Sequence, residues 1–230
     1  MAKESKRFEI KHNNMFMFSF VEVIRYYKFL EIILDRHKPL AASYLGTLNK
    51  FTESTKKMGE GNQQFTFNQI KLNDNLSRLG PLVQLEVESF YLFSKMLLDK
   101  IARAIEFYFG QAEKLSLDSH DDFTKKIQRY SNIKGLILHE GLLNLAQELK
   151  EDISDFRDSQ IAHHKSPRTA RGTTGDGRML LVQIYPTDKD EQKETKPLDD
   201  LMVKIDMFIE LVVQFVENNR EKTNLELKLT

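Results

Sequence analysis

The chain has no cysteine and no excess of charge of either sign. Without cysteine there is no disulfide, no thiolate zinc site and no cysteine nucleophile, a composition that fits a reducing compartment. The 34 basic residues balance 34 acidic residues, which argues against a nucleic-acid coat protein or a polybasic membrane binder, because both depend on a large positive field. Any contact with nucleic acid must therefore be local.

Long apolar runs are also missing. The stretch from Met15 to Val21 is mostly apolar, but Glu22, Arg25 and Lys28 then interrupt the pattern at helical spacing. This is typical of an amphipathic core helix and too short to span a bilayer. We therefore expect a globular, cytoplasmic protein that does not bind a membrane.

Apolar residues recur at helical spacing through most of the 230 residues and predict a mainly α-helical protein. The N-terminal third predicts three helices, near residues 15–36, 39–57 and 67–79. After Gly80 and Pro81 comes the strongest helical pattern, which ends at Gly110. Its apolar positions include Val83, Val87, Phe90, Leu97, Ile101, Ile105 and Tyr108.

The second half of the chain predicts further helices and a hairpin. Residues 116–122 offer caps for one helix, a long helix follows from about Ile133 to Phe156, and a last helix begins at Leu198. Between the last two, residues 168–186 are typical of a β-hairpin. We expect residues 1–80 to form a helical extension packed on a helical bundle of residues 81–230, with the hairpin inserted before the last helix.

Residues 156–165, with the sequence FRDSQIAHHK, contain the side chains that indicate a chemistry. Arginine offers a permanent charge and a planar fork of donors for phosphate, and histidine exchanges a proton near neutral pH. Together they can break a phosphodiester without a metal, and we expect no cofactor. The side chains suited to this chemistry are Arg157, His163 and His164, and the polar Asp158 follows the arginine.

Basic residues continue beyond this segment and form a local positive patch that the neutral total conceals. Only Asp176 opposes them over the same stretch, so we expect the patch to make a local contact with nucleic acid. Its members are Lys165, Arg168, Arg171 and Arg178.

Placement at the end of a helix supports this interpretation more than spacing does, because Arg7 and His12 form a similar pair. The alternative is that Arg157 and Asp158 cap a helix whose end carries solvated histidines, next to an ordinary polar face. Elsewhere, His139 and Glu140 lack the second histidine of a zinc-hydrolase helix, and residues 120–122 fit a capping loop better than a metal site.

The motif Phe156-Arg157-Asp158, three residues, Ala162-His163-His164 resembles the signature of the HEPN family. The resemblance implies an antiparallel up-and-down helical bundle and a metal-independent endoribonuclease of the toxin–antitoxin or phage-defence type. It also implies a homodimer that brings two copies of the motif together, and an antitoxin or regulatory partner. The resemblance covers roughly residues 81–220, and the N-terminal third lies outside it.

Carried over to this chain, the resemblance gives each motif residue a role. Arg157 would hold the scissile phosphate, His163 would act as general acid or base, and Asp158 would orient one of them. His164 is the rival for the role of His163, and it is also a candidate phosphate ligand. A second interpretation is a non-catalytic HEPN-like module that binds RNA, a nucleotide or a protein.

Overall fold

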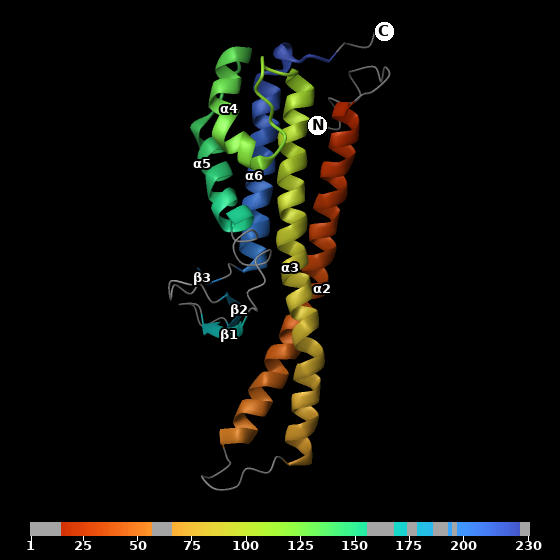
Figure 1. The fold of residues 1–230 in the computed structure, drawn as a ribbon. Helices are drawn as coiled ribbons and strands as arrows, with labels where there is room; N and C mark the ends of the chain where they lie inside the picture. The colour runs from red at the N-terminus through yellow and green to blue at the C-terminus, as the bar shows by residue number, and fades with distance from the viewer. Residues whose placement is uncertain are drawn as a thin grey trace. The chain divides into compact units, whose positions relative to one another are not determined.

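A computed structural model describes residues 15–56, 66–155, 168–173, 179–185, 193–194 and 197–225, with side chains described within 18–55, 66–153 and 197–225. The described part is mainly helical and contains five α-helices (Figure 1). The chain divides into two compact units. The first comprises Met1–Leu30, Tyr91–His163 and Asp199–Thr230, and the second comprises Glu31–Phe90 and His164–Leu198.

Two long helices contribute to both units. Helix α2 runs over Met15–Lys56 and helix α3 over Phe67–Phe109. The predicted division between residues 80 and 81 therefore falls inside α3, where the helix continues.

The predicted helix boundaries at Pro39 and Pro81 were wrong. Each proline lacks the amide proton that would bind the carbonyl four residues earlier, which belongs to Asp35 or Ser77. Both prolines and both of these residues are exposed, so water can solvate the two carbonyls and the helices continue. The end predicted at Gly110 is confirmed, because α3 stops at Phe109 and Gly110 has a φ of 77°.

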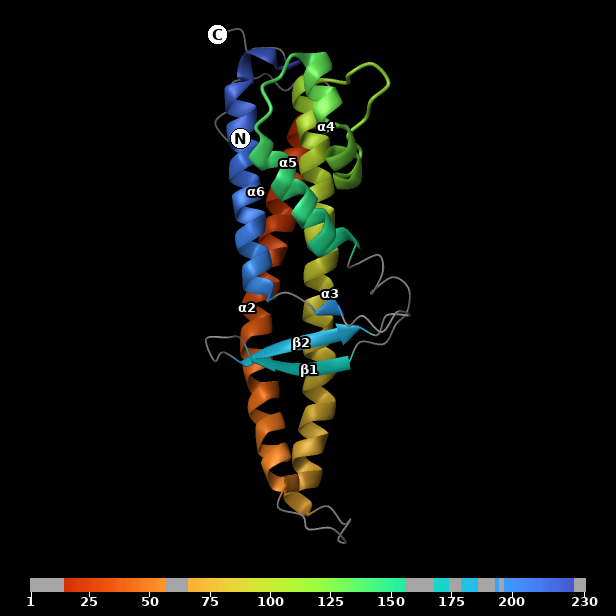
Figure 2. The same cartoon turned by 90° about the vertical axis from the view of Figure 1, so that its left-hand side faces the viewer.

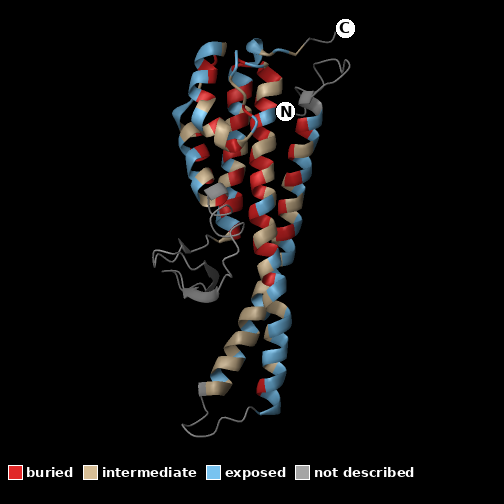
Figure 3. Ribbon diagram, in the orientation of Figure 1, coloured by how far each residue is buried: buried red, intermediate tan, exposed pale blue. Residues whose placement is uncertain are grey.

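The first unit contains most of the apolar core. Helix α6, Leu198–Asn218, runs alongside the parts of α2 and α3 that belong to this unit (Figure 1, Figure 2). Buried residues recur along each of these helices (Figure 3). Aromatic side chains pack between the helices, and the rings of Phe109 on α3 and Phe215 on α6 make an edge-to-face contact with 5.5 Å between their centroids. The predicted core positions of α3 and α6 are confirmed as buried: Leu97, Ile101, Ile105, Tyr108, Leu201, Ile205, Phe208, Val212, Phe215 and Val216.

Two short helices complete this unit. Helix α4, His120–Lys134, is N-capped by Ser119, whose side chain accepts from the Asp122 amide, as the sequence predicted. Helix α5, Glu140–Leu149, begins after His139. The predicted start of a helix near Ile133 was wrong, because α4 extends to Lys134 and Gly135 then turns with a φ of 64°.

The link between α4 and α5 is held by Asn219, directly after α6. Its side chain accepts from the Ile137 amide at 2.7 Å and donates to the Ile137 carbonyl at 2.9 Å and the Phe215 carbonyl at 2.8 Å. A 3-10 turn, Arg220–Lys222, follows. No described helix combines the length and the apolar character needed to cross a membrane.

The second unit contains the remaining parts of α2 and α3. Arg36 and the buried Glu86 form an ion pair at 2.7 Å between them. Three short strands, β1 Arg168–Thr173, β2 Met179–Tyr185 and β3 Lys193–Glu194, pair antiparallel in the order β1-β2-β3, and Figure 2 shows β1 and β2 side by side. The sequence predicts the turn at residues 172–177, and 174–177 of these lie outside the described residues, so the complete hairpin stays a prediction.

Candidate functional site

The predicted catalytic and RNA-binding side chains lie outside the part of the chain that the structure describes. Residues 156–167 and residue 178 contain Arg157, Asp158, His163, His164, Lys165 and Arg178. Arg168 and Arg171 lie in β1, paired with Ile184 and Leu181, and their side chains are not described.

The helix that leads to the predicted motif changes its geometry just before it. Helix α5 passes directly into a π-helix, η1, over Lys150–Asp155. A π-helix has more residues per turn than an α-helix. Side-chain directions calculated at 100° per residue along α5 therefore do not hold beyond Leu149. The apolar spacing predicts an inward face on this helix, of which Leu142, Leu145, Leu149 and Ile153 are buried. Leu138 precedes α5 and is half-buried, and Phe156 lies outside the described residues.

Ion pairs hold the first residues of η1, Lys150 and Asp152. Lys204 on α6 donates to Glu148 at 2.7 Å and to Asp152 at 2.9 Å, and these carboxylates raise the pKa of Lys204 above its ordinary value. Lys150 pairs with Asp121 on α4 at 2.9 Å. Hydrogen bonds from Lys125 and then Lys150 lower the pKa of Asp121 to about 2. The structure thus holds the chain through Asp152, five residues before Arg157.

His120 is a structural histidine. It has no exposed surface, its ring stacks on Phe123, and it meets Phe208 edge-on. Its Nε2 lies 2.9 Å from the Ala146 carbonyl; a carbonyl only accepts, so Nε2 carries the proton. Burial then lowers the pKa of His120 to about 4. A neutral, enclosed imidazole cannot contact a substrate. Residues 120–122, predicted as a capping loop, form the first turn of α4, and the N-cap is Ser119.

The Asp99 carboxylate on α3 organises the start of α4. It accepts from the His120 amide at 2.7 Å and pairs with Lys95. A carboxylate at a helix N-terminus interacts favourably with the helix dipole. Within the described residues, no group of three or more histidine, aspartate or glutamate side chains could hold a metal ion.

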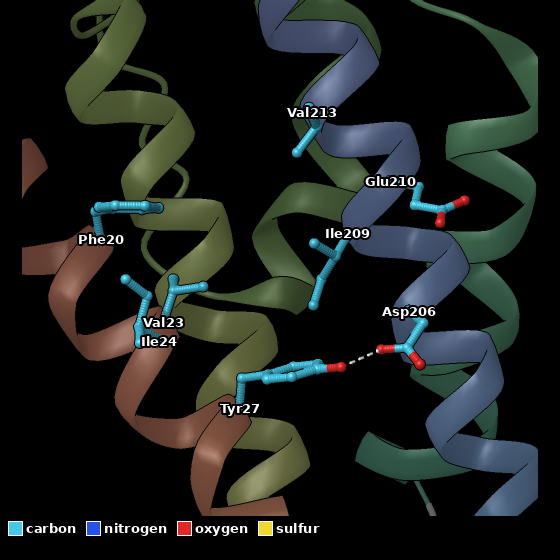
Figure 4. A pocket seen from close by; sticks show the side chains of 8 residues that line it. All are labelled: Phe20, Val23, Ile24, Tyr27, Asp206, Ile209, Glu210 and Val213. Atoms are coloured by element: carbon cyan, nitrogen blue, oxygen red, sulfur yellow. Dashed lines mark hydrogen bonds between the residues drawn. The ribbon is translucent and has the colours of Figure 1, made fainter. Parts of the chain in front are cut away.

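An apolar groove lies between α2 and α6 in the first unit (Figure 4). We call it the α2–α6 groove. Its volume is about 430 Å³, and its lining residues are Phe20, Val23, Ile24, Tyr27, Asp206, Ile209, Glu210 and Val213. One polar contact crosses it, from the Tyr27 hydroxyl to Asp206 Oδ1 at 2.8 Å. Glu210 turns its carboxylate outward at the rim (Figure 4).

The amino-acid sequence does not reveal this groove. The two helices that form it are separated by about 180 positions, and their apolar residues fit the pattern of an ordinary core. The structure leaves several of them exposed, including Val21 and Met207. The available signal was an apolar pattern on α6 wider than one buried face requires.

Comparisons with models of protein families, with curated proteins and with solved structures give no match to this chain. The likeness to the HEPN family therefore rests on the motif in residues 156–164.

Proposed function

We propose that the chain is a HEPN-like, metal-independent endoribonuclease of the toxin or phage-defence type. The observation that carries the proposal is the position of the motif, which starts directly after a π-turn fixed by ion pairs to α4 and α6. π-turns that interrupt helices recur at functional sites. An anchored turn offers the rigid support that a catalytic arginine needs to hold its geometry.

The proposed reaction is attack of a ribose 2′-hydroxyl on the adjacent phosphorus. His163 takes the 2′-hydroxyl proton, with His164 as the competing candidate, and Asp158 orients the imidazole. The new 2′-O–P bond forms as the P–O5′ bond breaks, and the leaving 5′ oxygen takes a proton from an imidazolium. Arg157 stabilises the extra negative charge on the phosphate. The products are a 2′,3′-cyclic phosphate and a 5′-hydroxyl.

The assembly belongs to the same proposal. The helices form an antiparallel up-and-down bundle, and residues 168–186 form a β-hairpin whose Arg168, Arg171 and Arg178 bind RNA together with Lys165. A homodimer in the cytoplasm brings two motifs to one cleft, and an antitoxin or regulatory partner controls it. The helical order of residues 81–220 and the basic residues after the motif support this arrangement.

The test is RNA cleavage by the purified full-length chain in excess EDTA, with total RNA and a matched DNA as substrates. We expect cleavage of RNA only, with cyclic phosphate ends. Replacement of Arg157 by alanine should lower the rate about a hundredfold or more, and one of His163→Ala and His164→Ala should do the same.

Matched controls are Arg129→Ala and His139→Asn, which change an exposed arginine and an exposed histidine far from the motif in sequence. Both should cleave like the wild-type chain. Unchanged cleavage by Arg157→Ala and by the double histidine variant would exclude the proposed site. Circular dichroism of each variant confirms that the helices remain.

A non-catalytic HEPN-like module is the second candidate, because the exposed apolar α2–α6 groove is typical of a protein-binding surface. It predicts that the wild-type chain binds RNA, a nucleotide or a protein and does not cleave RNA. The EDTA experiment separates the two candidates directly.

A further inference from the structure

Exposed apolar residues lie on both helices that form the α2–α6 groove. On α2, Val21 and Ile24 are 56% and 46% exposed, and on α6 Val203 and Met207 are 58% and 51% exposed. Contiguous exposed apolar surface around a groove is uncommon on a soluble chain that works alone. The groove therefore has the character of a docking site for a helix with one apolar face.

Carboxylates edge this surface along α6. Asp206, Glu210 and Glu217 follow one another at helical spacing, so they lie on one side of the helix. Neither Glu210 nor Glu217 has an ion-pair partner among the described residues. Lys204, the single basic residue of α6, is already held by Glu148 and Asp152. Among the described residues, no cation therefore neutralises Glu210 and Glu217 along the α6 side of the groove.

We propose that the α2–α6 groove binds an amphipathic helix of a partner protein that has lysine or arginine beside its apolar stripe. Its apolar residues, at i, i+3 or i+4 and i+7, contact Phe20, Ile24 and Ile209, and its basic residues face Glu210 and Glu217. A second copy of this chain fits less well, because it would bring a second acidic α6 to the same place. RNA and anionic lipid are repelled by the same row of carboxylates.

This inference is independent of the proposed nuclease activity, and its test measures binding only. The probe is a fluorescent helical peptide of roughly 18 residues, about five turns, with leucines on one face and lysines on both sides of them. A matched peptide has glutamate at each lysine position. Fluorescence anisotropy with the full-length chain should give about tenfold tighter binding of the lysine peptide, weakened by added salt.

Peptide affinities of variants in and beside the groove show whether the peptide binds there. Glu210→Lys combined with Glu217→Lys should weaken the lysine peptide about tenfold and favour the glutamate peptide. Ile24→Ser should weaken both peptides, because it removes an apolar contact. Asp74→Lys makes the same type of charge change at an exposed position of the second unit and should change neither affinity.

Equal affinity for the two peptides, or no response to the double charge reversal, would overturn the proposal. Sedimentation of the free chain tests the rival occupant. A dimer that dissociates in both Ile24→Ser and Glu210→Lys would assign the groove to a second copy and would also overturn it.

Discussion

His120 shows how one buried side chain can make the stability of the fold depend on pH. Its Nε2 donates a hydrogen bond to the Ala146 carbonyl, and its Nδ1 is buried without a hydrogen-bond partner within the described part of the chain. Burial is the main cause that lowers its pKa from 6.5 to about 4. Lys95 lowers it further, whereas the Ala146 hydrogen bond, Asp99 and Asp121 raise it.

The sign of the effect follows from proton binding. Between pH 6.5 and 4 the unfolded chain protonates this histidine and the folded chain does not, so stability is full above pH 6.5 and declines as the pH falls. We expect His120 to reduce the free energy of unfolding by roughly 2 kcal/mol between pH 8 and pH 5. Urea unfolding at a series of pH values measures this loss.

The variant His120→Gln keeps a donor for the Ala146 carbonyl and does not titrate. It should be less stable than the wild-type chain at pH 8, and the difference should narrow towards pH 5. His139→Asn removes an exposed histidine and keeps an acceptor at the N-cap of α5, so its pH profile should follow the wild type. Parallel profiles for wild type and His120→Gln would refute the assignment of His120 as the sensor.

The helices differ in how well local sequence determines their ends. The core faces of α3 and α6 follow from apolar spacing, because a face buried on one side must repeat every three or four residues. Local sequence wrongly predicted helix boundaries at Pro39 and Pro81. Each proline lies on the exposed side of its helix, so water can solvate the unpaired carbonyl four residues earlier and the helix continues. Whether a proline faces water is decided by tertiary packing, which local sequence does not contain.

Two glycines in helical regions should respond to alanine in opposite directions. Gly135 ends α4 with a φ of 64°, where a Cβ is strained, so Gly135→Ala should cost about 1 kcal/mol of unfolding free energy. Gly46 lies inside α2, and a Cβ there meets nothing within 4 Å. Gly46→Ala should therefore stabilise the chain by about 0.5–1 kcal/mol. Urea unfolding monitored by helical circular dichroism compares the two, and the same sign for both would contradict the backbone argument.

The candidate sites were predictable to different degrees. The motif around Arg157 is visible in sequence because it follows a long amphipathic helical pattern, but its geometry depends on the chain after η1. The α2–α6 groove could not be predicted, because Tyr27 and Asp206 meet only through folding. An exposed apolar residue such as Met207 has the same sequence pattern as a buried one.

Burial is distributed unevenly along the two long helices. In α2 the buried residues end at Ile33, and every described residue beyond it is intermediate or exposed. In α3, Gln69 is the one buried residue before Val83. Gln69 is held by hydrogen bonds to Thr66 and to the Ser54 carbonyl. Residues 34–55 of α2 and 67–82 of α3 therefore contain no buried apolar residue.

Hydrogen exchange should reveal this difference, because amides open locally where few apolar contacts oppose opening. We expect amides of residues 38–55 and 67–80 to exchange about a hundredfold faster than those of 19–33 and 83–108. Mass spectrometry of peptides from the exchanged chain measures this gradient, and Gln69→Ala should accelerate exchange in 67–80 and around Ser54, whose carbonyl loses a donor. Equal protection along the full length of both helices would show instead that the second unit gains its stability from burial against another chain.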